Sequence, residues 1–202
     1  QLETSKELQA VYENASLILT DGKPLLWIAK WYGTPIKEKI SGSDLFPLLC
    51  KMAAEKGYKM FFLGAAEGVA AKAAENLMNR FKGLQVVGTY SPPFGFEKDP
   101  VEMDKIKSMI KEAAPHILIV GLGCPKQEKF MYHHCAELGV PISFGLGASF
   151  DFEAGNIKRA PRWMANHGLE WLFRITQDPK RMAKRYLVDD RKILGLAIKY
   201  KK

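Results

Sequence analysis

The stretch His116-Ile117-Leu118-Ile119-Val120-Gly121-Leu122-Gly123 decides the fold class of this chain. Its apolar run has the length and composition of a strand that is buried on both faces of a parallel sheet, and glycines end the run. Pro125 follows at a position typical of the first turn of a helix. Working outward, we expect the same unit of strand, glycine turn and helix elsewhere in the chain.

This unit recurs on both sides of the opening stretch. Expected strands cover residues Leu17–Thr20, Lys59–Leu63, Leu84–Val87, His116–Val120 and Pro141–Phe144. Expected helices lie at about 5–15, 23–32, 43–56, 67–81, 100–114 and 125–138. Before the fifth of these helices, Asp99-Pro100 has the form of an N-cap followed by a first helical residue. The alternation predicts the α/β class, with a Rossmann-like parallel sheet covered by helices on both faces.

The chain changes character near residue 156. After Gly155 the patterns are helical only, and the charge changes with them. The whole chain has 30 basic and 22 acidic residues, a net charge of +8. Residues 158–202 hold 13 of the bases and four of the acids, which leaves 17 bases and 18 acids for residues 1–157. We therefore predict an α/β domain over residues 1–156 and a basic, amphipathic helical appendage over residues 157–202, with an anionic partner.

Cysteine usage and hydropathy indicate the cellular compartment in which the protein works. The three cysteines, Cys50, Cys124 and Cys135, form no CxxC pair, so the sequence predicts neither a disulfide framework nor a structural zinc site. A reducing, cytoplasmic compartment is the default for such a chain. No apolar run approaches the ~20 residues that cross a bilayer.

The predicted strand ends point to a phosphate-bearing ligand. Ligands of open parallel sheets bind beyond the carboxyl ends of the strands, and five segments there contain glycine, namely residues 21–22, 64–68, 88–90, 121–123 and 145–147. Glycine lets backbone amides approach a ligand, and the N-terminus of the next helix attracts an anion. Lys126 and Phe150 stand where GxGxxG needs its third glycine, and no P-loop motif is present, which argues against dinucleotide redox chemistry and P-loop hydrolysis. Each glycine pair alone fits a tight strand-to-helix turn equally well.

Two polar segments at this edge carry candidate chemistry. Asp21 follows a predicted strand, where it fits a general base that accepts a proton from an attacking hydroxyl, or an Asx turn or N-cap. Lys126, Gln127 and Glu128 stand in a first helical turn. There the lysine can meet a phosphate, and the other two side chains can bond a base or a sugar. A merely solvated first turn explains the same three residues.

The predicted appendage mixes cations with apolar side chains. The cations are Arg159, Arg162, Arg174, Arg181, Lys184 and Arg185, and the apolar residues are Trp163, Met164, Leu169, Trp171, Leu172, Phe173 and Ile175. This pattern fits a helix in an anionic membrane surface, and it fits packing on the protein body or on another subunit, so a homo-oligomer stays open. We expect no nucleic-acid partner, because no recognition module is present, and no metal, because no ligand spacing is present.

Three segments resemble the WecG/TagA/CpsF glycosyltransferases: residues 121–129 (GLGCPKQEK), 147–151 (GASFD) and 154–164 (AGNIKRAPRWM). Residues 168–174 (GLEWLFR), Asp21-Gly22 and 41–45 (SGSDL) extend the likeness over nearly the whole chain. The resemblance implies a bacterial, inverting transferase without a DxD metal motif or a cofactor. It would bind a UDP-sugar in the α/β domain and move N-acetylmannosamine, N-acetylmannosaminuronic acid or another hexose to a polyprenyl-diphosphate-linked sugar. It would work at the inner face of the cell membrane, which its appendage contacts, in wall teichoic acid or other surface-polysaccharide synthesis.

The resemblance also implies roles for residues. The family's proposed base falls on Asp21 and its pocket glutamine on Gln127, and the arginines for the donor diphosphate fall on Arg174, on Arg181 and on Lys184 or Arg185. The remaining predicted binding set is Lys39, Gly42, Asp44, Gly64, Gly121, Gly123, Lys126, Glu128, Gly147, Ser149 and Arg159. Lys39 stands where TagA-type members carry an arginine. A lysine cannot make the two parallel hydrogen bonds that an arginine makes to a phosphate or a carboxylate. The family's N-terminal strand would precede Gln1, so we expect the part of the pocket that this strand supplies to be missing.

Two other functions stay open from the sequence. A nucleotide-dependent oxidoreductase would use the same sheet edge, although the broken glycine motif argues against it. A non-catalytic adaptor that binds a nucleotide or a membrane would use the same basic tail.

Overall fold

The computed structural model describes residues 2–161, 163–164, 167–184 and 192–200. The chain forms two compact units. The first, called here the sheet unit, consists of residues 1–18 and 42–156. The second, called the helical unit, consists of residues 19–41 and 157–202, so two separate segments of the chain build it.

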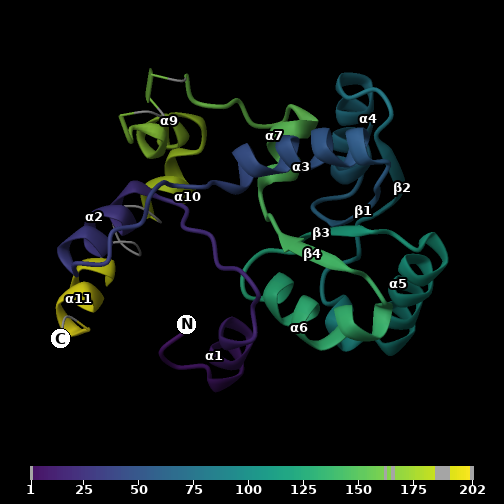
Figure 1. Ribbon diagram of the computed structural model, residues 1–202, viewed down its shortest axis with the longest axis horizontal. Helices are drawn as coiled ribbons and strands as arrows, with labels where there is room; N and C mark the ends of the chain where they lie inside the picture. The colour runs from purple at the N-terminus through teal and green to yellow at the C-terminus, as the bar shows by residue number, and fades with distance from the viewer. Residues whose placement is uncertain (1, 162, 165–166, 185–191, 201–202) are drawn as a thin grey trace. The chain divides into compact units, whose positions relative to one another are not determined.

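A four-stranded parallel sheet forms the centre of the sheet unit (Figure 1). The strands β1 (Lys59–Gly64), β2 (Gln85–Tyr90), β3 (Ile117–Gly121) and β4 (Ile142–Gly145) lie in the order β2-β1-β3-β4. All three neighbouring pairs run parallel, which places every strand's carboxyl end at the same edge. Four of the five predicted strands and the α/β class with a Rossmann-like sheet are thereby confirmed.

Helices cover both faces of this sheet. The helices of the sheet unit are α1 (Lys6–Glu13), α3 (Gly42–Lys56), α4 (Val69–Arg80), α5 (Pro100–Ala113), α6 (Lys126–Leu138) and α7 (Ser149–Ala154), with a short 3-10 helix, η1 (Phe96–Lys98). The neighbouring residues Phe61 and Phe62 of β1 belong to different core clusters because successive strand side chains point to opposite faces. Phe62 packs with residues of α3, α4 and α7, and Phe61 packs with residues of α5 and α6 (Figure 1).

Local sequence signals explain where helices begin. The Asp99 carboxylate accepts hydrogen bonds from the backbone N–H groups of Val101 and Glu102, at 3.0 and 3.3 Å, and Pro100 opens α5. This predicted cap is confirmed. Pro125 occupies the N-cap of α6 rather than its first helical position, because the helix begins at Lys126.

The predicted strand Leu17–Thr20 is wrong. These residues belong to no strand, and Leu17 and Ile18 are 72% and 58% exposed. An apolar run becomes a strand only where a neighbouring strand satisfies its backbone, and in the described chain the sheet ends at β2 and β4. Thr20 instead accepts one backbone hydrogen bond, from Ile40 N–H at 2.9 Å.

The helical unit contains α2 (Lys23–Trp31), α9 (Glu170–Gln177), α10 (Pro179–Lys184) and α11 (Lys192–Lys199). Its two chain segments are joined by side chains. The Tyr32 hydroxyl donates to the Ala197 carbonyl at 2.6 Å. A Cβ atom added to Gly168 would come within 2.9 Å of Lys23 Cδ, so the turn before α9 packs against the start of α2.

Glycines bring β1 and β3 together at their carboxyl ends. Gly64 and Gly121 are register partners, and a Cβ atom on Gly64 would lie 2.5 Å from the Gly121 carbonyl carbon. A Cβ atom on Gly121 would lie 2.5 Å from two ring carbons of Phe150 and 3.1 Å from the Gly147 carbonyl oxygen. Phe150 is fully buried, so its ring has little room to move.

Gly121→Ala should therefore destabilise the sheet unit. Overpacking of this kind costs about 1–3 kcal/mol, which should lower the midpoint of urea unfolding followed by circular dichroism. Gly195→Ala in α11 is the control, because an added Cβ meets no atom within 4 Å there. An unchanged midpoint for Gly121→Ala would contradict the close packing.

Candidate active site

A cavity of about 710 Å³ opens at the carboxyl ends of β1, β2 and β3. Its walls come from the segments that follow the three strands, residues 65–67, 90–96 and 121–122, together with Lys126. Sequence analysis placed Gly121 and Lys126 in a ligand site at this edge, and the structure brings them together here. Gly64 directly precedes residues 65–67, which form one wall of the cavity. A cavity of this size suits a nucleotide or a sugar.

The loop Ser91–Gly95 was missed by sequence analysis. Its Ser91 hydroxyl lies 3.1 Å from the carbonyl oxygens of Gly64 and of Ala66, which ties the loop to the end of β1. Phe96 beyond it is buried in the core, whereas the Phe94 ring is fully exposed. The sequence signal was an aromatic residue after Pro92-Pro93 at a strand end, but exposure of the ring cannot be seen in a sequence.

Lys126 lies at the wall of this cavity, beside the Phe94 ring. Its ammonium nitrogen is 2.6 Å from Glu97 Oε1 and 4.6 Å from the centre of the ring. The hydrogen bond from Lys126 lowers the pKa of the Glu97 carboxyl, which favours its charged form. The arrangement offers a ligand one cation next to one exposed aromatic plane.

Gln127 carries a hydrogen-bond acceptor that no described residue uses. Its side chain is 7% exposed, and its Nε2 donates to Glu128 Oε1 at 2.9 Å. Oε1 is buried without a hydrogen-bond partner in the described chain, and a Cβ atom on Gly147 would lie 3.6 Å from it. Such an acceptor favours a ligand that brings an N–H or O–H group.

The end of β4 is packed more tightly than sequence analysis expected of a ligand loop. Ser149 begins α7 and is buried, and a Cβ atom on Gly42 would lie 3.0 Å from its Oγ. These two predicted binding residues therefore contact each other across the start of α3 and the start of α7. Asp44 is exposed in the first turn of α3, and Gly123 is exposed in the turn before α6, where its carbonyl accepts the Gln127 N–H at 3.0 Å.

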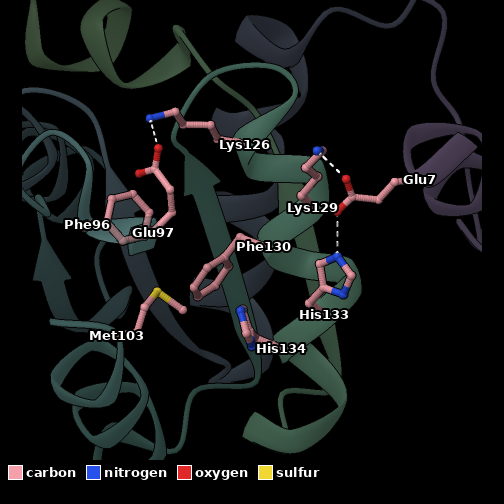
Figure 2. Close-up of a pocket in the computed structure, with 9 residues that line it drawn as sticks. All are labelled: Glu7, Phe96, Glu97, Met103, Lys126, Lys129, Phe130, His133 and His134. Atoms are coloured by element: carbon pink, nitrogen blue, oxygen red, sulfur yellow. Dashed lines mark hydrogen bonds and ion pairs between the residues drawn. The ribbon is translucent and has the colours of Figure 1, made fainter. Parts of the chain in front are cut away.

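A second cavity, of about 270 Å³, is lined by residues of α1, η1, α5 and α6 (Figure 2). Its cations already have internal carboxylate partners. Glu7 pairs with Lys129 and, at 2.9 Å, with His133, and these hydrogen bonds lower the pKa of the Glu7 carboxyl. Burial lowers the pKa of His134 on the same wall. Each of the two lysines on its wall therefore pairs with a carboxylate.

In the helical unit, the structure brings together three segments that carry predicted site residues. The Thr20–Ile40 backbone hydrogen bond pairs the segment of Asp21 with that of Lys39. Lys39 Nζ lies 3.4 Å from Glu170 Oε2, and Arg174 NH2 lies 2.6 Å from Glu170 Oε1. Asp21 is exposed and precedes Gly22, which is the N-cap of α2, so Asp21 itself is not the cap.

The remaining predicted cations lie on the appendage, residues 157–202. Arg159 and Lys184 are exposed, Arg181 lies in α10, and the Arg181 side chain and the whole of Arg185 and Arg162 lie outside the described residues. Among the residues described, no group of three or more His, Cys, Asp or Glu side chains is placed to hold a metal ion. None of the helices in the described ranges has the length and hydropathy to cross a bilayer.

Comparison with known proteins identifies the family. Residues 1–202 match the model of the "Glycosyl transferase WecG/TagA/CpsF family". An N-acetylglucosaminyldiphosphoundecaprenol N-acetyl-beta-D-mannosaminyltransferase of Bacillus spizizenii is 37% identical over 174 residues, which cover 86% of this chain and 65% of the relative. A protein of the same name from Bacillus subtilis is 32% identical over 171 residues, 85% of this chain and 64% of the relative. The chain thus spans slightly less than two-thirds of the length of each relative. It belongs to the WecG/TagA/CpsF family of glycosyltransferases.

Proposed function

We propose that this chain moves a sugar from a UDP-sugar to a sugar carried on a polyprenyl diphosphate. The observation that carries the proposal is the cavity at the strand ends, where Gly121, Lys126 and an exposed ring meet in a chain of this family. Backbone N–H groups and a lysine suit a diphosphate, and the ring suits a nucleobase. The names of the two relatives support N-acetylmannosamine as the sugar and lipid-linked N-acetylglucosamine as the acceptor.

In the proposed reaction, Asp21 accepts the proton of the acceptor hydroxyl while its oxygen attacks the anomeric carbon. The attack comes from the face opposite UDP, so the configuration inverts. The electron pair of the breaking bond goes to the β-phosphate oxygen of UDP. Lysine, arginine and helix N-termini stabilise that growing charge, an electrostatic contribution that often dominates catalysis. No metal ion takes part in this proposal.

Asp21→Asn tests the base directly. Because general base catalysis contributes roughly 10²–10⁴-fold, transfer should fall by at least about 10²-fold, while UDP affinity stays unchanged. The measurement is product mass after incubation with a panel of UDP-sugars and lipid-diphosphate-linked N-acetylglucosamine, alongside UDP titration calorimetry. Asp104→Asn, an exposed carboxylate in α5, is the matched control.

Two outcomes would overturn these assignments. Full transfer by Asp21→Asn would remove this residue from the mechanism. A wild-type chain that binds UDP but releases no product from any donor would favour the non-catalytic adaptor instead.

Phe94→Ala tests the nucleotide site. Stacking of a base on an aromatic ring contributes about 1–3 kcal/mol, so the Kd for UDP should rise about tenfold. Phe94→Trp should retain affinity, because indole offers a similar plane. Leu48→Ala removes another exposed apolar side chain, in α3, and should leave the Kd unchanged. Equal Kd values for wild type and Phe94→Ala would place the base elsewhere.

We also propose that the helical unit binds an anionic membrane surface. Trp163, Trp171 and Leu172 are exposed, and residues 158–202 carry 13 bases against four acids. Exposed aromatic side chains among cations suit the headgroup layer of an anionic leaflet. Such binding would bring the enzyme to its lipid-linked acceptor.

A flotation experiment tests the membrane surface. The Trp163→Ala/Trp171→Ala double variant should float less than wild type with vesicles that contain phosphatidylglycerol, and neither should float well with phosphatidylcholine alone, because both charge and aromatic burial contribute. Phe94→Ala removes an exposed ring from the sheet unit and should float as wild type does. Undiminished flotation of the double variant would contradict this surface.

A further inference from the structure

Gln127 and Glu128 form a pair of polar side chains at the start of α6. Gln127 Nε2 donates to Glu128 Oε1 at 2.9 Å, and Gln127 is 7% exposed. Two oxygens of the pair, Gln127 Oε1 and Glu128 Oε2, are buried without a hydrogen-bond partner in the described part of the chain. A buried acceptor without a donor destabilises a fold by about 1–3 kcal/mol, and a ligand that donates a hydrogen bond can offset this.

The chemistry of Glu128 determines which way the Gln127 amide faces. An ionised carboxylate only accepts hydrogen bonds, whereas an amide has a donor end and an acceptor end. Nε2 of Gln127 therefore points to Glu128, because the reverse orientation would bring two acceptors together. The acceptor Oε1 is left on the side of the turn after β4, where a Cβ atom on Gly147 would lie 3.6 Å from it.

Packing around Gln127 cannot choose between the two orientations. A Cβ atom on Gly145 would lie 3.0 Å from Gln127 Nε2 and 3.0 Å from Met131 Cε, so the amide lies against the end of β4. A half-turn of the amide exchanges its oxygen and its nitrogen without changing its shape, so the same contacts admit both. The hydrogen bond to Glu128 is the contact that distinguishes them.

We propose that Glu128 is a positioning residue, which orients the Gln127 amide so that its oxygen, and not its nitrogen, faces a bound sugar. The inference rests on the proposed function and deepens it. The ligand group must then donate a hydrogen bond, as a hydroxyl or the N–H of an acetamido group does. The donor sugar and the acceptor sugar can each supply such a group. Glu128 itself touches neither sugar in this proposal.

The rival interpretation is that Glu128 only stabilises α6. It stands in the first turn of this helix, where a negative charge favours the helix dipole by about 0.3–1 kcal/mol. That role changes the free energy of unfolding and does not involve Gln127. A positioning role acts through Gln127 and depends on whether the side chain at position 128 accepts or donates a hydrogen bond.

A series of variants at position 128 tests the inference. Glu128→Gln can accept or donate, so about half of the molecules should present the wrong end of the Gln127 amide, and kcat/KM should fall about twofold. Glu128→Lys only donates, which should turn Gln127 Nε2 toward the sugar and lower kcat/KM at least about tenfold. An added cation by itself would strengthen binding of the anionic donor, so this loss has the opposite sign to a general charge effect.

Separate KM values identify which sugar supplies the group. A rise confined to the UDP-sugar assigns it to the donor sugar, and a rise confined to the lipid-linked acceptor assigns it to the acceptor sugar. Gln127→Ala removes the group that Glu128 orients. In that background Glu128→Lys should lower kcat/KM by less than a further twofold or so, because the two side chains act through one contact.

The side-chain amide resonances of Gln127 give a measurement that needs no transfer reaction. They are identified by their loss in Gln127→Ala, and they should shift in Glu128→Gln and in Glu128→Lys. Glu137→Gln is the matched control, because it removes an exposed carboxylate, paired with Lys107, from the last turn of the same helix. It should leave the Gln127 resonances and kcat/KM unchanged.

Three results would overturn the positioning role. They are unmoved Gln127 resonances in both variants at position 128, an undiminished kcat/KM in Glu128→Lys, and a loss in the Gln127→Ala background as large as that in the wild-type background. A wild-type chain that transfers no sugar would overturn the proposed function instead, whereas the resonances would still show whether Glu128 holds the Gln127 amide.

Discussion

The close approach of the glycine backbones at the ends of β1 and β3 is the constraint on which the rest of the structure depends. Gly64 and Gly121 pair in register, and the Gly121 carbonyl accepts the Ala65 N–H at 2.9 Å. Any side chain here would meet backbone or the buried Phe150 ring, so only glycine fits at these two strand ends. The cavity follows from this ending, because the segments that continue from the strands must diverge around it.

The two units carry different groups of predicted site residues. In the sheet unit, Lys126 and Lys129 each pair with a carboxylate, and the exposed Phe94 ring and the buried Gln127 acceptor are further groups of the candidate site. In the helical unit, Lys39 and Arg174 both pair with the Glu170 carboxylate. Residues 19–41 belong with 157–202, so the predicted base and the tail cations are parts of one compact body.

Sequence reasoning succeeded where local pattern and burial coincide. Four strands could be predicted because a sheet covered on both faces requires continuous apolar runs, and the Asp99 cap could be predicted because its partners lie within three residues. Leu17–Thr20 failed because the same kind of run lacks a neighbouring strand. The exposure of the Phe94 ring and the contact between Lys39 and Glu170, 131 residues apart in the chain, could not be predicted, because both are properties of the fold alone.

The hydrogen bond of the Ser91 hydroxyl has a thermodynamic consequence. Its one proton is accepted by the Gly64 or the Ala66 carbonyl, each 3.1 Å away. Together with Pro92-Pro93 and the buried Phe96, this contact fixes the backbone on both sides of Phe94 before any ligand arrives. Ordering a residue costs about 1–2 kcal/mol, and here that cost is incurred once, when the protein folds. Ligand binding at the loop Ser91–Gly95 should therefore cost the protein little entropy. The association rate should also depend little on motion of this loop.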